Sequence, residues 1–590
     1  AKDETEAAIA AAERDRRAGR VPAALQRLEA ALRRAEAGGD AVRIARVAGS
    51  LGVALQASGA PAEAERVLER SLELARESDA PAIEAATLAN LANLWAAGGE
   101  TARAVDAYDR AATLAARAGA DTVAARARVN AAASLVKRGS PEPARERLDA
   151  ALDHLDAVSD RAARAEALVT AGVAARELAT ASGRDDDLLR AHDVLAEAAR
   201  LAGEAEDSRL GSYAAGELAS LYLSEGRDEE ALVLTRRALF LAQAASSPEA
   251  LYRWQWQLGR LRAGRGEREA AVDAYRDAIA TLRSIRTDLV AVDPATGRSR
   301  FRETVGEVHL ELADLLLRPP GPGEAVAPAD LVEARAVVEQ LKTVELVDYF
   351  EDECVAVLQG TAQPIEDIDP HAAVLYPVIL PDRLELLLSI EDRMLHATVD
   401  VPATTVGAEA TAFREALQNI YRDPLPGAQK LYEWLVAPFR DALAARAIDT
   451  LVFVPDGALR QIPLAALHDG ERFLVETYAV ALAPGMSLLG PRPTSEFAIR
   501  PLVGGLVGEL PAVGEELRAI AQLYEGTTLE GSAFTTDRLR AELQRTDYTV
   551  VHLASHAQFS SEPEDTFVRV ADGRLSMDAL ERLIAVSRFR

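Results

Sequence analysis

The chain has 590 residues, of which 27% are charged, and its formal net charge at pH 7 is −27. This length exceeds what one hydrophobic core can cover, so we expect several domains or a repeat array. The negative net charge argues against a nucleic-acid partner, because phosphate binding needs clustered Lys and Arg.

Several common kinds of site are excluded by the sequence. None of the four lysines follows a glycine, so no phosphate-binding G-x-x-x-x-G-K loop exists. The single cysteine, Cys354, allows neither an internal disulfide nor a C-x-x-C metal pair, and we expect no cofactor and no metal. No apolar run approaches the roughly 18 residues of a membrane helix, which argues against a membrane partner. A lone cysteine fits a reducing, cytoplasmic compartment, while a secreted or periplasmic location stays open if a leader was removed before Ala1.

The first half of the sequence repeats with a period of 40 residues. The period is marked by the turn glycines Gly19, Gly59, Gly99 and Gly139, and again by Gly226 and Gly266. Small residues such as Gly52 and Gly259 precede turn glycines by seven positions, where they let a paired helix approach closely. Larger residues such as Leu68 and Tyr275 recur after the turn and would fill the adjoining space.

This pattern resembles the tetratricopeptide repeat, with a longer period than usual. We expect an α superhelix of helix hairpins over residues 1–284. Such arrays present a concave surface that usually binds protein, and the alternative is a plain spacer.

Residues 285–329 are predicted to form a helical connector that ends in the Pro- and Gly-rich linker RPPGPGEAVAPA. Asp330 and Glu333 then predict a capping box at the start of a new helix. Cys354 lies near the end of this helix, directly after Glu351, Asp352 and Glu353. These negative charges disfavour a thiolate, so we expect a structural thiol at this position and not a nucleophile.

The second half alternates predicted strands and helices. We expect strands at 374–380, 384–390, 394–401, 451–454, within 464–480, at 502–503 and at 549–553, and helices at 408–420, 431–445, 513–524 and 536–544. This alternation predicts an α/β domain with a parallel or mixed sheet that is covered on both faces.

The last predicted strand ends in a small polar segment, Ser555-His556-Ala557. Open α/β sheets place their sites just beyond the carboxyl ends of strands, so His556 is our candidate general base. The alternative is a purely structural histidine. His552 lies four residues earlier, but a metal-binding H-x-x-x-H needs a helix, and a strand is predicted here, so we expect no zinc site.

Four segments, in this order after a tetratricopeptide array, resemble the CHAT family of caspase-like proteins: LKTVELVDYFEDEC, LVFVPDGALRQIPLAALHDG, LPAVGEELRAIAQLY and VVHLASHAQF. The resemblance implies a caspase-like (clan CD type) domain over residues 330–590 and a cysteine peptidase with a His-Cys dyad. It maps the dyad histidine onto His556. The backbone N–H of Ala557, where many relatives have glycine, would help to hold the oxyanion.

The resemblance also implies where a nucleophile should lie, after the next strand in a motif like L-S-A-C. The sequence stops at LIAVSRFR, short of such a motif. We therefore expect a CHAT domain truncated at its C-terminal end, with no nucleophile in this chain, and a C-terminal fragment that completes it. The loop between Gly505 and Leu510 also looks short for the family, as if residues were missing there.

Two functions follow from these observations. The first is a caspase-like cysteine endopeptidase, or a cleaved portion of one, which acts on protein substrates while the array recruits or senses a protein partner. By analogy with the family, its role would be bacterial regulatory proteolysis. The second is a catalytically inactive pseudo-peptidase that serves as a repeat-based binding scaffold.

Overall fold

The computed structural model describes residues 2–17, 20–156, 158–285, 300–321, 323–350, 371–391, 393–486, 499–508, 510, 512–545, 548–558, 566–577, 579–580 and 583. The chain divides into two compact units, Ala1–Gly490 and Pro491–Arg590. The first unit contains the repeat array and a five-stranded sheet, and the second contains two three-stranded sheets.

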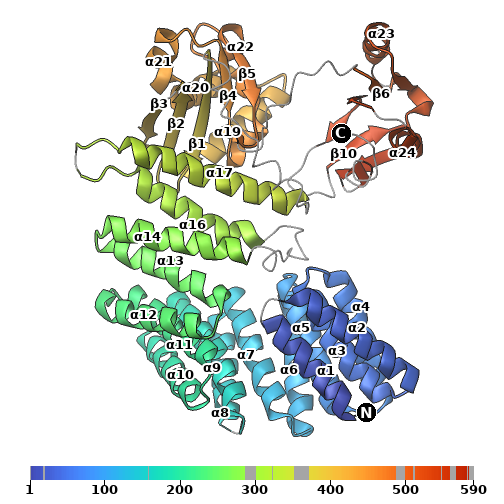
Figure 1. Ribbon diagram of the computed structural model, residues 1–590, viewed down its shortest axis with the longest axis vertical. Coiled ribbons are helices and arrows are strands. Elements are labelled where there is room, and N and C mark those ends of the chain that lie inside the picture. The colour runs from blue at the N-terminus through green and yellow to red at the C-terminus, as the bar shows by residue number, and fades with distance from the viewer. Residues whose placement is uncertain are drawn as a thin grey trace. The chain divides into compact units, whose positions relative to one another are not determined.

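The first unit begins with an array of antiparallel helix hairpins (Figure 1). Its helices are α1 (Lys2–Arg17), α2 (Val21–Gly38), α3 (Ala41–Ala57), α4 (Pro61–Glu77), α5 (Pro81–Ala97), α6 (Thr101–Arg117), α7 (Asp121–Lys137), α8 (Pro141–Leu155), α9 (Arg161–Ser182), α10 (Asp185–Glu204), α11 (Ser208–Ser224), α12 (Asp228–Ala244), α13 (Pro248–Gly264) and α14 (Arg268–Ser284). The tetratricopeptide-type array predicted from the 40-residue period is therefore confirmed.

The turn glycines separate the two helices of a hairpin. Gly59, Gly99, Gly139, Gly226 and Gly266 have φ angles of +80°, +78°, +73°, +70° and +75°. L-residues with a side chain rarely adopt this left-handed conformation, whereas glycine adopts it at little cost. This explains why glycine recurs with the period of the hairpin.

The predicted pairing of small and large residues is also present. A Cβ atom on Gly52 would lie 2.4 Å from Cγ of Leu68, and one on Gly259 would lie 2.9 Å from the ring of Tyr275. The two helices of these hairpins can approach this closely only because no side chain intervenes.

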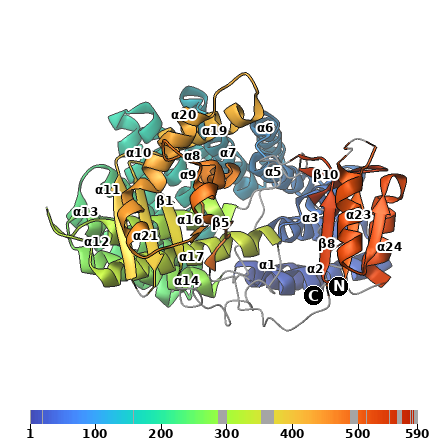
Figure 2. The same ribbon diagram turned by 90° about the horizontal axis from the view of Figure 1, so that it is seen from above.

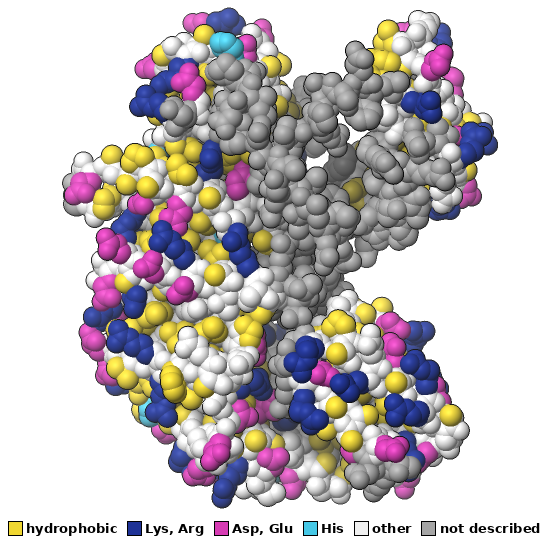
Figure 3. Space-filling view, viewed as in Figure 1, with side chains coloured by type: hydrophobic (Ala, Val, Ile, Leu, Met, Phe, Trp, Pro, Cys, Tyr) yellow, Lys and Arg dark blue, Asp and Glu magenta, His cyan; other side chains and the backbone are white. Residues whose placement is uncertain are grey.

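Ion pairs add contacts between the helices of the array, and Figure 3 shows basic and acidic side chains interspersed over its visible face. Asp187 is buried and accepts hydrogen bonds from Nε and Nη2 of Arg145, at 2.9 and 2.5 Å, and from the Ser182 hydroxyl at 2.8 Å. The bonds from Arg145 are the main reason why the pKa of Asp187 falls to about 2. This carboxylate fastens α10 to α8.

Two longer helices follow the array, α16 (Arg300–Leu317) and α17 (Pro328–Phe350). The predicted capping box is wrong, because α17 already begins at Pro328 and Asp330 lies within its first turn. Asp330 instead pairs with Arg268 at 2.9 Å, and Glu333 pairs with Arg276 at 2.6 Å. Both carboxylates therefore hold α17 against the last hairpin of the array.

The five-stranded sheet has the order β3-β2-β1-β4-β5. Its strands are β1 (Ala372–Ile379), β2 (Leu384–Ile390), β3 (Arg393–Val399), β4 (Thr450–Phe453) and β5 (Ala479–Leu482). The neighbours of β2 run antiparallel to it, and β1, β4 and β5 are parallel, so the sheet is mixed.

Helices cover both faces of this sheet (Figure 2). Val374 and Val452 face the core shared with α16 and α17, whereas Leu375 and Phe453 face α19 (Ala403–Gln418), α20 (Leu425–Leu435) and α21 (Arg440–Ala445). The single helix predicted at 431–445 is broken into α20 and α21. The break contains Pro438, which has no N–H to continue a helix.

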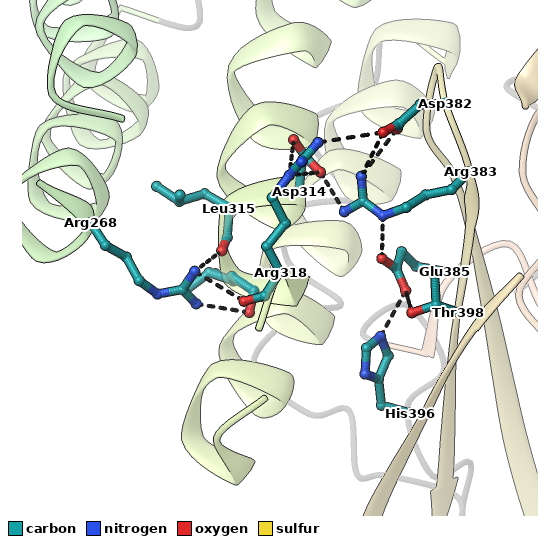
Figure 4. Close-up of polar contacts among 10 residues, drawn as sticks. Arg268, Asp314, Leu315, Arg318, Asp382, Arg383, Glu385, His396 and Thr398 are labelled. Carbon is teal, nitrogen blue, oxygen red and sulfur yellow. Dashed lines mark hydrogen bonds and ion pairs between the residues drawn. The ribbon is translucent and has the colours of Figure 1, made fainter. Parts of the chain in front are cut away.

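A polar network links the last hairpin of the array to the sheet (Figure 4). Arg268 of α14 donates to the backbone carbonyls of Leu316 and Arg318 at the end of α16, each at 3.1 Å. From α16, Asp314 accepts a 2.5 Å hydrogen bond from Arg383, which lies in the turn between β1 and β2.

The network ends on a buried carboxylate in β2. Glu385 accepts hydrogen bonds from Arg383 at 2.5 Å and from Thr398 at 2.7 Å, and it lies 2.7 Å from Nε2 of His396. Burial alone would raise the pKa of Glu385, but the bonds from His396, Thr398 and Arg383 outweigh burial and lower it. The carboxylate therefore stays charged and ties β2 to β3, while Arg383 connects it to Asp314 of α16.

The second unit contains a parallel sheet of order β7-β6-β8. Its elements in chain order are β6 (Pro501–Gly505), α23 (Val513–Leu523), β7 (Thr527–Glu530), α24 (Thr536–Arg545) and β8 (Val550–Ala554). Val503 and Ala554 pack with α23 on one face, while Leu502 packs with α24 on the other. Because β7 and β8 lie on opposite sides of β6, the two crossover helices must cover opposite faces.

The remaining strands are β9 (Ala557–Gln558), β10 (Phe567–Val570) and β11 (Gly573–Ser576), which form an antiparallel sheet of order β11-β10-β9. Close packing in this unit again requires glycine, since a Cβ atom on Gly504 would lie 2.4 Å from the ring of Phe534. After β6, the Leu510 N–H donates to the Leu506 carbonyl at 3.3 Å. The suggestion that residues are missing between Gly505 and Leu510 stays a prediction.

Candidate active site

His556 lies two residues beyond the end of β8, at the carboxyl edge of the parallel sheet. The strand order reverses at β6, because β7 and β8, which follow it in the chain, lie on opposite sides of it. Open α/β sheets place their sites outside the carboxyl ends of strands, close to the point where the strand order reverses.

Backbone contacts fix the position of His556. Its carbonyl accepts a hydrogen bond from the Arg569 N–H at 2.8 Å, and the neighbouring Ser555 hydroxyl donates to the Arg569 carbonyl at 2.6 Å. The residue is exposed, and no described residue forms a hydrogen bond with its imidazole. The ring is therefore accessible to an incoming group while its backbone is held by β10.

Ala557 presents its backbone N–H away from β10. Since the Arg569 N–H bonds to the His556 carbonyl, residues 556 and 569 form a hydrogen-bonded pair of the antiparallel ladder. Ala557 and Val568 are the next pair, whose backbone groups point away from each other. As β9 is the edge strand of its sheet, the Ala557 N–H points to the open edge.

The His552 side chain contacts α23 and not the strand end. It lies in the middle of β8, is half-buried, and its Nε2 lies 2.9 Å from Oε1 of Glu516 in α23. The segment from His552 to His556 runs out of a strand and contains no helix, so the two rings do not share a helical face. The described part of the chain contains no cluster of three His, Cys, Asp or Glu side chains suited to a metal ion.

The predicted thiol cannot be placed. Cys354 lies outside the described residues, so its predicted structural role stays a prediction.

Sequence reasoning missed a second polar cluster, at the carboxyl end of β4 in the first unit. Nζ of Lys342 in α17 lies 2.6 Å from Oδ1 of Asp456, and Arg460 lies 3.3 Å from the same oxygen and also pairs with Glu345. The Lys342 side chain is only 2% exposed. Burial lowers the pKa of Lys342, and the charge of Asp456 opposes this effect.

These four residues lie in two of the segments that carried the family resemblance, LKTVELVDYFEDEC and LVFVPDGALRQIPLAALHDG. The signal that could have found the pair was a lone lysine within an apolar helical face, since such a lysine needs a buried acid. The cluster fastens α17 to the loop after β4. Its two cations, Lys342 and Arg460, pair with the carboxylates of Asp456 and Glu345.

The fold defines a helical repeat array followed by α/β sheets with a histidine at a strand end. Residues 425–587 match the family model of the CHAT domain, which is a caspase-like peptidase family. The chain thus combines a tetratricopeptide-type array with a CHAT domain, as the sequence resemblance implied. The sequence matches no curated protein.

Solved structures that resemble the chain include repeat proteins. BtubC from P. vanneervenii has 18% identity and a TM-score of 0.28, and the match covers 48% of this chain and 92% of that one. A signal transduction ATPase with a tetratricopeptide repeat sensor from Pyrococcus horikoshii has 14% identity and a TM-score of 0.34, with coverage of 58% and 54%. A tetratricopeptide repeat protein from Parabacteroides merdae has 17% identity and a TM-score of 0.31, with coverage of 49% and 98%. At these TM-scores the likeness supports no functional conclusion.

No helix in the described ranges combines the length and the apolar character needed to span a bilayer.

Proposed function

We propose that the chain is the histidine-bearing part of a caspase-like cysteine endopeptidase that acts on protein substrates. The observation that carries this proposal is the exposed imidazole of His556 at the switch point of a parallel sheet, inside the region that matches the CHAT domain. A general base must lie where it can reach the proton that it accepts, and the exposed strand end gives the His556 imidazole this access.

In the proposed reaction, His556 accepts the proton of a thiol, and the thiolate attacks the carbonyl carbon of a peptide bond. The Ala557 N–H donates to the oxygen on which negative charge develops. The C–N bond then breaks, and the imidazolium gives its proton to the leaving amine. Water then attacks the remaining thioester while His556 accepts a proton from it. As the C–S bond breaks, the acid product leaves and the imidazolium returns the proton to the sulfur, which restores the thiol.

The thiol is proposed to come from residues outside 1–590, in the same polypeptide or in a separate fragment. The open edge of the parallel sheet supports this part of the proposal. Among the residues that the structure describes, β8 is an edge strand, and Val550 at its start is 41% exposed. An unpaired edge of this kind accepts a further strand, and a strand added there would end beside His556.

The repeat array is proposed to recruit or sense a protein partner, in keeping with what superhelical arrays generally do. The polar network from Arg268 through Asp314 and Arg383 to Glu385 supports a coupling between partner binding at the array and the position of the five-stranded sheet. These contacts join α14 to β2 through hydrogen bonds and ion pairs. A displacement of α14 would therefore shift β2.

The test uses the full natural protein with its protein substrate and a thiol-alkylating reagent. We expect iodoacetamide to abolish cleavage, whereas a metal chelator leaves it unchanged, because the proposed chemistry needs a thiolate and no metal. The Cys354→Ser variant should cleave at the wild-type rate and stay fully sensitive to iodoacetamide. Cleavage that resists alkylation, or no cleavage in any state, would instead favour the binding scaffold.

A further inference from the structure

We propose that the exposed side of α12 in the repeat array binds an acidic amphipathic helix of a protein partner. The inference rests on the proposed recruiting role of the array, and it names the surface and the chemistry of the partner. Residues of a helix that are three, four and seven positions apart lie on one side of it. Four exposed residues of α12 have this spacing and together form the α12 face: Val233, Arg236, Arg237 and Phe240.

The apolar part of the α12 face lies in water. Phe240 and Val233 are 69% and 65% exposed, and within the described array no other large apolar side chain is as exposed. The opposite side of α12 holds the array together, since Ala238 and Ala242 pack in one cluster with Trp254 of α13. Phe240 and Val233 are thus not needed for the core, and they stand seven positions apart, as the anchors of a helix–helix contact do.

The basic part of the α12 face lies between these two anchors. In the part of the chain that the structure describes, no carboxylate forms an ion pair or a hydrogen bond with Arg236 or Arg237. Glu229, one turn earlier, pairs with Arg265 at 2.6 Å. The pKa of Glu267 is lowered chiefly by its hydrogen bond from Arg265 and least by the charge of Arg236. The two guanidinium groups therefore form a local positive patch.

This combination of charges and anchors matches an acidic amphipathic helix. Seven residues of helix span about 10.5 Å, so two apolar side chains seven positions apart on a partner helix can contact Val233 and Phe240. Carboxylates three and four positions after the first of them would meet Arg236 and Arg237. A guanidinium binds a carboxylate through two parallel hydrogen bonds, which makes Glu or Asp the matching side chain.

The net charge of the chain favours a short protein segment over a membrane or a nucleic acid. At a formal charge of −27, the chain as a whole repels an extended anionic surface. A short helix contacts only the α12 face, where the nearest charges are positive, and more distant charges are screened by salt.

The experiment measures binding of labelled helical peptides to the full natural protein by fluorescence anisotropy. The acidic peptide carries two Leu seven positions apart with two Glu between them, and matched peptides carry Gln or Lys in place of Glu. We expect the acidic peptide to bind at least about tenfold more tightly than the Gln peptide, which corresponds to about one charge-assisted contact. Arg236→Glu combined with Arg237→Glu should reverse this preference in favour of the Lys peptide. Phe240→Ser should weaken binding of the acidic peptide at least about fivefold.

Two control variants change equally exposed side chains elsewhere in the array, and neither should alter binding. Leu189→Ser removes an apolar side chain that is 62% exposed but follows the three aspartates in the first turn of α10. Arg66→Glu reverses an exposed arginine of α4 that pairs with Glu63 at 3.2 Å. All proteins are treated with iodoacetamide beforehand, so that binding is measured without cleavage.

Equal binding of the acidic and Gln peptides, or a preference that survives the double charge reversal, overturns the inference. So does a dimer in analytical ultracentrifugation, or binding to vesicles that contain phosphatidylserine, if Phe240→Ser abolishes it, because another occupant would then cover the α12 face. A protein that binds the acidic peptide as expected but cleaves no substrate would remove the proposed peptidase and leave this surface in place.

Discussion

Replacing His556 by alanine should lower kcat/KM for the cleavage of a protein substrate by about 10²- to 10⁴-fold, the range that a general base typically contributes. The reason is that the thiol would lose its proton acceptor while substrate binding stays intact, so the loss should appear in kcat and not in KM. His556 is exposed and its imidazole packs against no core, so the variant should fold normally.

His552→Ala is the matched control for this prediction. It removes the same kind of side chain four residues earlier, but His552 lies within β8 and contacts Glu516. We expect it to keep most of the activity. Free imidazole added to the His556→Ala protein should restore part of the rate, which a purely structural defect would not allow. Equal losses in both variants, without rescue, would mean that the strand end is only structural.

Replacing Lys342 by methionine should destabilise the first unit by about 3–5 kcal/mol, because it leaves the buried Asp456 carboxylate without its closest cation. Lys342 and Asp456 are 2% and 13% exposed, so water cannot replace the lost ion pair. Hydrogen exchange of the backbone amides in α17 and β4 measures this change locally, as the chain contains more than one cooperative unit.

The control is Lys430→Met, which breaks a pair of similar length between Lys430 and Glu409, at 2.7 Å. Lys430 is 50% exposed, and pairs of this kind contribute about 0–1 kcal/mol. The double variant Lys342→Met with Asp456→Leu should recover most of the lost stability, since apolar replacement of a whole buried pair is often neutral. Equal effects of the two lysine variants would show that the buried pair does not clamp α17.

Local patterns in the sequence predicted much of the fold. The 40-residue period located the turn glycines, because each hairpin is built from contacts within one repeat, such as that between Gly52 and Leu68. The predicted strand 384–390 coincides with β2, whose residues are all buried and are apolar except for Glu385 and Ser389. The predicted strand 549–553 overlaps β8 with a shift of one residue, and the parallel pairing of β8 with β6 agrees with the expected sheet.

What the sequence did not predict depends on short or distant contacts. β7 and the strands β9 to β11 have between two and four residues each and carry no clear period. The pair of Lys342 and Asp456 joins residues that are 114 positions apart, and no local pattern specifies such a contact. The position of His556 opposite Arg569 was missed for the same reason, since it exists only through the register of β9 and β10. The predicted capping box was wrong because α17 begins two residues before Asp330, and the carboxylates of Asp330 and Glu333 pair with Arg268 and Arg276.

The central claim is that His556 activates a thiol outside this chain. The most direct test is to identify the cysteine that reacts in the active protein. A substrate-like peptide with a thiol-reactive C-terminal group is incubated with the full natural protein, and mass spectrometry locates the adduct. The account predicts an adduct on a cysteine other than Cys354, formed much more slowly in His556→Ala and at the normal rate in His552→Ala. An adduct on Cys354, or labelling that does not depend on His556, would contradict it.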